Sequence, residues 1–203
     1  NEIVSHNLII TFKRAIEDTK AYAYMGVVQY DSKDRKFLNY LNSPRRGIGL
    51  YRVGEKIHYK FLLFNNSIIK ASIFDKIKLD FSLTHYGGEE LDFASKLNKI
   101  YPNMICASPN TLVYRNNYPN LAAHCLRLEE FGCINFKKLK KNLQLDVVGY
   151  SFLLKRTIFL KTLVRILFIL CRFFNFIIPH QNFYWVVRLQ FLCAILKGYY
   201  KLS

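Results

Sequence analysis

Residues 86–93 read Tyr-Gly-Gly-Glu-Glu-Leu-Asp-Phe, and this stretch decides how the middle of the chain is organised. The glycine pair lets the backbone turn tightly, and three carboxylates, Glu89, Glu90 and Asp92, follow at once. Apolar residues then recur at three-residue steps, which predicts a helix over 89–100 with its acids in the first turn. In a chain of net charge +16, this acidic corner either caps a helix or presents a carboxylate to chemistry. Spacing alone leaves both interpretations open.

Strands, turns and helices are expected on both sides of the corner. Apolar periodicity and turn residues predict these elements: a helix over 3–20, a strand over 23–30, a turn at 31–34, a strand over 59–64, a strand and helical turn over 68–77, a strand over 104–114, and a helix over 120–131 ending at Gly132. A polar loop is expected between the first two strands. Pro109 should lie at a sheet edge or a break in its strand, and Gly132 is a candidate C-cap.

Composition excludes several classes of protein. The 203 residues are 51% hydrophobic, which suffices for a real core and argues against disorder. The five cysteines are scattered, without a CxxC pair, and are interpreted as buried thiols of a reducing compartment. The chain begins on Asn1 without an initiator Met, and we expect it to be a fragment.

The last third of the chain is basic and apolar. From Cys133 onward there are twelve Lys or Arg residues and one acid, Asp146, which favours an anionic membrane surface over nucleic acid. Within 157–174, Lys161, Arg165 and Arg172 fall within about 40° of one another on a helix. We expect an amphipathic helix lying in the membrane interface, with segment 183–200 as an aromatic anchor; a packed hairpin and a spanning helix are the alternatives.

Five segments of the chain form a recognisable pattern: 64–70 (FNNSIIK), 74–77 (FDKI), the corner at 86–93, 110–114 (NTLVY) and the hydrophobic tail 173–200. Together they resemble the acceptor-side half of family 2 glycosyltransferases. In that family an Asn-containing strand precedes a helix that starts with Gly-Gly-Glu-Asp. The likeness spans roughly residues 20–200, and the Gly-Gly-Glu-Glu core is its most specific part.

The resemblance implies an α/β fold: a partial, Rossmann-like GT-A glycosyltransferase domain followed by C-terminal amphipathic helices. The expected domains are an acceptor-side part over 1–132, a basic connector over 133–150, and a membrane-interfacial tail over 151–203. The family's nucleotide-binding half, with its Asp-x-Asp motif, would precede residue 1. The expected place is the cytoplasmic face of a bacterial inner membrane, as a peripheral protein.

The implied activity is inverting transfer of a sugar from a nucleotide sugar, UDP-linked by expectation, to a glycan or lipid-linked glycan in surface polysaccharide biosynthesis. The residues that the resemblance assigns are Glu90 as catalytic base, Glu89, Asn65, Gly88 and Asp92 as acceptor-binding, and Arg46 and Arg52 as diphosphate-binding. A turn cap is the alternative for Asn65, and a solvated loop is the alternative for the two arginines. Mg or Mn is the expected cofactor, with its main ligands outside this chain and none within it.

Besides the missing nucleotide-binding half, two departures from the family pattern bear on activity. Glu90 stands where the family has Asp, which shifts the carboxylate by one methylene. Tyr114 stands where the family often has a metal-binding His, and a phenol is a poor ligand for Mg or Mn. His124 lies in an expected helix and is interpreted as a core or surface histidine. The main rival hypothesis is therefore that the chain is a non-catalytic, membrane-associated remnant of the same fold. A second rival, a nucleic-acid-binding protein, is weaker because the sequence shows no recognisable DNA-recognition helix.

Overall fold

The structure is a computed structural model that describes residues 2–3, 7–177 and 183–201. It is mixed α/β, as expected, and its contacts divide the chain into two units. The first unit comprises residues 1–80 and 89–118, and the second comprises 81–88 and 119–203. This boundary differs from the expected one after residue 132, because the helix at 121–133 packs with the C-terminal helices.

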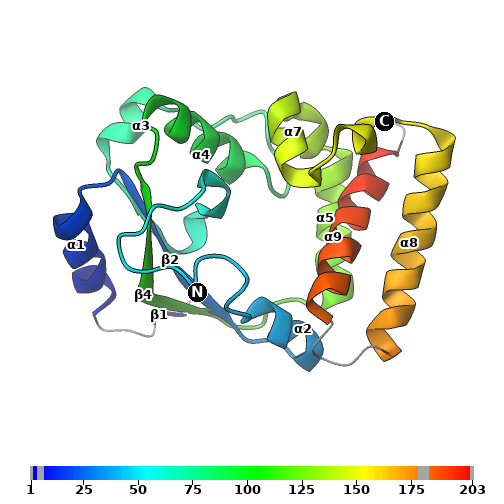
Figure 1. Ribbon diagram of the computed structural model, residues 1–203, viewed down its shortest axis with the longest axis horizontal. Helices are drawn as coiled ribbons and strands as arrows, with labels where there is room; N and C mark the ends of the chain where they lie inside the picture. The colour runs from blue at the N-terminus through cyan, green and yellow to red at the C-terminus, as the bar shows by residue number, and fades with distance from the viewer. Residues whose placement is uncertain (1, 4–6, 178–182, 202–203) are drawn as a thin grey trace. The chain divides into compact units, whose positions relative to one another are not determined.

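The first unit is built on a four-stranded sheet in the order β1-β4-β2-β3 (Figure 1). The strands are β1 (Glu2–Ile3), β2 (Ala23–Tyr30), β3 (Ser67–Ile69) and β4 (Ile105–Arg115). β2 runs parallel to β4, while β1 and β3 are antiparallel to their neighbours. The parallel pair is expected for α/β chains, in which a crossover helix connects such strands.

α1 (Leu8–Thr19) covers one face of this sheet and α4 (Glu89–Ile100) the other (Figure 1). The unit also contains α2 (Arg35–Leu41), α3 (Ser72–Lys76) and the 3-10 turns η1 (Tyr59–Phe61) and η2 (Phe64–Asn66). Tyr24 belongs to the cluster with α1, and Ala23 and Met25 to the cluster with α4. This alternation is the period of two that a strand imposes on its side chains.

β4 lies between β1 and β2, so Pro109 is at a break in the strand and not at a sheet edge. Met25 pairs with Ala107 and Val27 with Leu112, so the register shifts across the residues between them. Proline cannot donate to a ladder, and a bulge is where an inner strand tolerates it.

Three expectations for this unit were wrong in part or in full. Residues 59–64 are not a strand but contain η1 and the start of η2. The first helix begins at Leu8, because Ile3 belongs to β1 and pairs with Val113 of β4. The expected loop contains α2, whose N-cap is Asp34: its Oδ1 accepts a hydrogen bond from the Phe37 N–H at 3.1 Å. The strand over 23–30, the strand and helical turn after residue 67, and the helix over 89–100 are confirmed.

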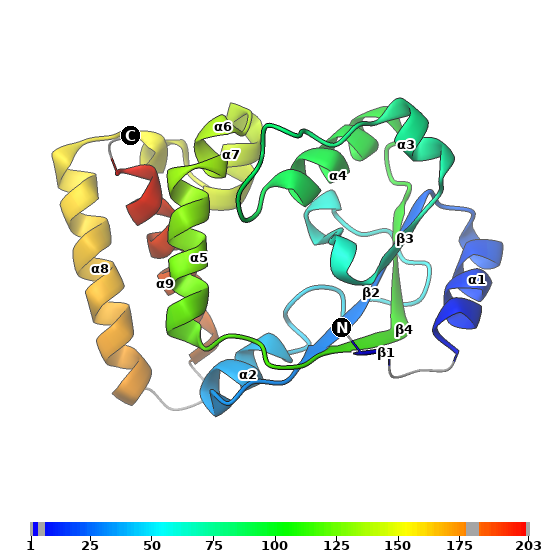
Figure 2. The same ribbon diagram turned by 180° about the vertical axis from the view of Figure 1, so that it is seen from behind.

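The second unit is helical (Figure 2). It consists of α5 (Leu121–Cys133), α6 (Asn135–Lys138), α7 (Lys141–Val148), η3 (Ser151–Leu154), α8 (Ile158–Ile177) and α9 (Phe183–Tyr199). α9 packs against both α5 and α8. The expected connector over 133–150 is therefore largely helical.

Glycines bring α5 and α9 into backbone contact. A Cβ on Gly132 would collide with the carbonyl oxygen of Ile195, and a Cβ on Gly198 with that of Glu129. Gly132 is thus inside α5 and is not the C-cap that the sequence suggested. It is needed for the close approach of two helices.

Candidate active site

The glycine pair of the acidic corner has the backbone conformation that its sequence predicts. Gly87 has φ +81° and Gly88 φ +100°, values that side-chain-bearing residues rarely adopt. The buried amide of Asn135 donates to the carbonyl oxygens of His85, at 2.6 Å, and Gly87, at 2.8 Å. The segment before α4 is therefore held in the second unit by side-chain hydrogen bonds.

Glu90 is in the first turn of α4 and is tied to a distant segment of the first unit. Its Oε1 accepts a hydrogen bond from the backbone N–H of Phe64 at 2.7 Å. This bond connects the Gly-Gly-Glu-Glu helix to η2, so two of the segments behind the glycosyltransferase resemblance meet at one carboxylate.

The surroundings of Glu90 make its carboxyl a stronger base. Burial raises the pKa of Glu90 above its ordinary value of 4.5, and the neighbouring charge of Glu89 adds to this. The Phe64 N–H and the charge of Arg115 act in the opposite direction without reversing it. A carboxylate held in one position with a raised pKa can accept a proton from a hydroxyl more readily than a solvated one.

The other two acids of the corner differ from Glu90. Asp92 is 5% exposed and forms an ion pair with Lys96 at 2.6 Å, one turn along α4. That pairing gives Asp92 a structural role in the helix. Glu89 is half-buried, and its enclosed Oε2 accepts no hydrogen bond from any residue that the structure describes.

The two adjacent asparagines have different surroundings. Asn65, the predicted acceptor contact, is half-buried in η2, beside the Phe64 amide that binds Glu90. Asn66 is buried and donates through Nδ2 to the carbonyl oxygens of Val27, at 2.8 Å, and Thr111, at 3.0 Å. Asn66 thus closes the break in the sheet, a role that the sequence did not reveal because nothing local distinguishes the two residues.

The two predicted diphosphate-binding arginines lie in a loop of the first unit. Arg46 donates through Nη1 to the carbonyl oxygen of Leu41 at 3.2 Å, and its guanidinium lies 5.0 Å from the ring centroid of Tyr30 and 5.9 Å from that of Tyr40. It therefore packs onto the end of α2. Arg52 is exposed, and its backbone N–H donates to the Glu55 carboxylate at 2.9 Å.

Arg115 is the cation that sequence reasoning missed. It ends β4, and its charge acts on Glu90. Its guanidinium lies 5.2 Å from the Tyr118 ring centroid. Its position directly after the predicted strand over 104–114 was the available signal, because side chains at the carboxyl ends of parallel strands often line a site.

The residues considered for metal binding lie apart from any ligand cluster. Tyr114 lies in β4 and pairs with Gln29 of β2 and Glu2 of β1. His124 is buried in α5, with its ring 4.8 Å from that of Phe191, which confirms a core histidine. No group of three His, Cys, Asp or Glu residues in the described part of the chain is placed to hold a metal ion.

A second candidate surface lies on α8. Leu160, Val164 and Cys171 are buried on one side of this helix, and Arg165 and Arg172 are exposed. Another side forms what we call the apolar face of α8, which consists of the exposed Ile158, Phe159, Ile166, Ile169, Phe173 and Ile177. At about 100° per residue, the two arginines lie along one edge of this face.

The described helices include none with the length and hydropathy needed to cross a bilayer. α9 matches the packed-hairpin alternative, because Phe183, Val187 and seven further residues of it are buried. Trp185 alone of its aromatic trio at 183–185 is largely exposed, at 65%. The amphipathic surface therefore belongs to α8.

Cysteine chemistry is confined to the interior. Four of the five thiols are buried and all are free. Burial raises the pKa of both Cys125 and Cys193 to about 12, so they stay protonated and unreactive at neutral pH.

A scan of protein-family models, a search of curated proteins and a search of solved structures each found no match for this chain. The functional assignment must therefore rest on the site itself.

Proposed function

We propose that the first unit is the acceptor side of an inverting GT-A glycosyltransferase in which Glu90 is the catalytic base. The donor is a nucleotide sugar and the acceptor a glycan or lipid-linked glycan of surface polysaccharide biosynthesis. The observation that supports this is the carboxylate of Glu90, positioned by the Phe64 N–H at 2.7 Å and raised in pKa by burial.

The proposed step is a single displacement. The acceptor hydroxyl oxygen forms a bond to the anomeric carbon of the donor, and the bond from that carbon to the diphosphate oxygen breaks. The hydroxyl proton passes to Glu90 Oε2, because the hydrogen bond to Phe64 holds Oε1. Glu89, whose enclosed Oε2 has no described donor, is placed to accept a hydrogen bond from another acceptor hydroxyl after a side-chain rotation.

In an enzyme of this kind, a separate nucleotide-binding half would hold most of the ligands of Mg or Mn. Such a metal, when bound, neutralises the leaving diphosphate. No group of three His, Cys, Asp or Glu residues that could hold it occurs among the residues that the structure describes. Their part is to bind the acceptor and to take its proton.

The test is sugar transfer by the full-length protein carrying Glu90→Gln. The amide cannot accept the hydroxyl proton but can keep the Phe64 hydrogen bond, so the fold should survive. We expect kcat to fall about 10²- to 10⁴-fold. Glu90→Asp keeps a carboxylate but withdraws it by one methylene from the Phe64 N–H, so transfer should fall, though less than in Glu90→Gln. Asp75→Asn, an exposed acid of the same unit, is the matched control.

Undiminished transfer by the Glu90→Gln variant would refute the assignment of the base. Absence of transfer by the wild type, with every nucleotide sugar and with the upstream half present, would favour the second candidate below.

The second candidate is a non-catalytic, membrane-associated module, favoured by the apolar face of α8. Six large apolar side chains there are at least half exposed, more than an ordinary surface helix presents. Arg165 and Arg172 edge the face, as they would in a helix lying at an anionic membrane surface with its cations among the headgroups. The proposed location is the cytoplasmic face of a bacterial inner membrane.

Vesicle flotation tests this binding. The chain should float with vesicles of phosphatidylglycerol and phosphatidylcholine, and far less with phosphatidylcholine alone. Ile169→Asp with Phe173→Asp should abolish flotation, whereas Leu126→Asp, an equally exposed apolar position on α5, should not. Flotation that survives the double substitution, or a stronger shift with an oligonucleotide than with anionic vesicles, would overturn the membrane assignment.

A further inference from the structure

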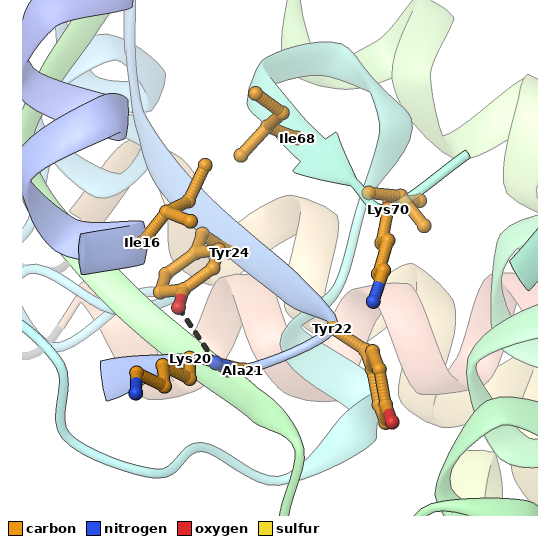
Figure 3. A pocket seen from close by; sticks show the side chains of 8 residues that line it. Ile16, Lys20, Ala21, Tyr22, Tyr24, Ile68 and Lys70 are labelled. Carbon is orange, nitrogen blue, oxygen red and sulfur yellow. Dashed lines mark hydrogen bonds between the residues drawn. The ribbon is translucent and has the colours of Figure 1, made fainter. Parts of the chain in front are cut away.

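The first unit contains a cavity of about 450 Å³ that the proposed reaction does not use (Figure 3). It lies between the end of α1, the start of β2 and β3. Its lining residues are Ile16, Lys20, Ala21, Tyr22, Tyr24, Ile68, Ile69 and Lys70. None belongs to the acidic corner, so this is a separate site. Its volume is in the range of small-molecule pockets.

The walls of the cavity are largely hydrocarbon, and the Tyr24 hydroxyl among them already has partners. The hydroxyl of Tyr24 accepts a hydrogen bond from the Ala21 N–H at 2.7 Å and is 2.8 Å from Thr19 Oγ1. The ring of Tyr22 packs on that of Tyr101 at 4.5 Å. With Ile16 and Ile68, these rings offer hydrocarbon surface and few hydrogen bonds to an occupant.

Two lysines supply the charge of the cavity. Lys20 ends α1, where its backbone has φ 52° and its N–H donates to the carbonyl of Ile16. Lys70 follows β3, and its Nζ lies 5.4 Å from the ring centroid of Tyr22. Figure 3 shows Lys20 on the α1 side and Lys70 on the opposite side of the pocket. Both side chains are exposed, and no carboxylate is among the lining residues.

We propose that this cavity binds a small amphipathic anion, a molecule with one phosphate or carboxylate and an apolar body. The hydrocarbon of the ligand would replace water against Ile16, Ile68 and the tyrosine rings, which is favourable in proportion to the area covered. Its headgroup would remain at the opening, between Lys20 and Lys70. A highly polar ligand is disfavoured because the walls could not satisfy its buried hydrogen-bonding groups.

Isothermal titration calorimetry of the full chain with octyl phosphate, octanoate and 1-octanol tests the proposal. The two anions should bind with one-to-one stoichiometry, and 1-octanol at least about tenfold more weakly. Binding of one anion and not the other would identify phosphate or carboxylate as the headgroup that the site selects.

Substitutions of the lining residues test whether the ligands bind in the cavity. Lys20→Asn with Lys70→Gln should weaken both anions about tenfold; asparagine is chosen because it tolerates the left-handed conformation at position 20. Ile68→Trp, which fills the cavity, should abolish binding. Lys13→Gln with Lys99→Gln removes two exposed charges elsewhere in the unit and should change nothing.

Two results would overturn the proposal. One is affinity for the anions that is equal in the wild type and in both cavity variants, since the ligands would then be adsorbing elsewhere, for example on the apolar face of α8. The other is equal affinity for 1-octanol and the anions, which would mean that the lysines do not recognise charge.

Discussion

The interactions that stabilise the inside of each unit differ between the two units of this chain. In the first, buried polar groups hold an irregular backbone: Asn66 bridges the break in the sheet, and Glu90 ties α4 to η2. In the second, glycines let α5 and α9 touch along their backbones. The irregular sheet of the first unit therefore depends on individual hydrogen bonds, one of which also positions the Glu90 carboxylate. The packing of α5 on α9 in the second unit depends instead on the absence of a side chain at two glycines.

The largest effect is expected from Gly132→Ala in the second unit. Its new methyl group would collide with the backbone of Ile195, and backbone atoms cannot move aside as a flexible side chain can. The free energy of unfolding should fall by about 3 kcal/mol. Fluorescence of Trp185, the single tryptophan of the chain, reports this unit during denaturation in urea.

Leu126→Ala on the same helix is the control, because Leu126 is 68% exposed and should matter by less than about 0.5 kcal/mol. If Gly132→Ala were as mild as this control, close helix packing would not be what stabilises the second unit.

The second-largest effect is expected from Asn66→Ala in the first unit. This substitution removes both N–H donors to the carbonyls of Val27 and Thr111, and the free energy of unfolding should fall by about 2 to 3 kcal/mol. Hydrogen exchange of the β2 and β4 amides measures it, with the neighbouring, half-buried Ser67→Ala as control. Unchanged exchange in the Asn66 variant would show that the break in the sheet needs no bridge.

A smaller effect is expected at the one buried carboxylate of α5. Burial acts to raise the pKa of Glu129, but hydrogen bonds from Lys197 and Lys201, at 2.7 and 2.5 Å, outweigh it and the pKa is lowered. The ion pairs therefore stabilise the folded state at every pH above about 4.5, the ordinary pKa of the group. This contribution is lost as the pH falls through the lowered pKa of Glu129.

Glu129→Gln should accordingly lower the free energy of unfolding at pH 7 by about 1 to 2 kcal/mol. The effect is no larger because water partly screens the two lysines. The difference from wild type should shrink as the pH falls below 4.5, when measured by urea denaturation across that range. Glu130→Gln, at the exposed neighbouring position, should show no such trend. A deficit that is the same at every pH would contradict the ion-pair account.

The smallest effect on stability is expected at Glu90 and has the opposite sign. Because the folded-state pKa of Glu90 is raised, its ionisation opposes folding once the pH exceeds the unfolded-state value near 4.5. Glu90→Gln should therefore stabilise the chain progressively as the pH rises through the raised pKa. Thermal melts from acid to neutral pH measure this, and a destabilised variant at pH 7 would contradict it.

Elements whose signal lies within their own residues were predicted correctly, and roles that depend on distant residues were not. The helix at 89–100 and the strand at 23–30 were found because their own periodicity specifies them. The predicted strand over 59–64 was wrong. The aromatic residues of this segment are typical of a strand, whereas its backbone forms two 3-10 turns, with Leu62 between them in the core. The roles of Asn66 and Gly132 depend on partners 39 to 63 residues away, which no local pattern contains.

α2 was missed although a local signal existed. Asp34 is followed by Phe37, Tyr40 and Leu41 at helical spacing, the pattern of an N-cap before an amphipathic helix. The acidic corner was located correctly because glycine conformation and helix start are both local. That Glu90 binds the Phe64 amide could come only from the structure, because the two residues are 26 positions apart.

The most direct test of the central claim is the pH dependence of kcat/KM for sugar transfer by the full-length protein, because this profile reports the pKa of the base in the free enzyme. The proposal predicts that the rate falls with acidification through a pKa above 4.5, that of Glu90, and that Glu90→Gln abolishes this limb together with most of the activity. A limb that is unchanged in the Glu90→Gln variant would contradict the assignment of Glu90 as the base.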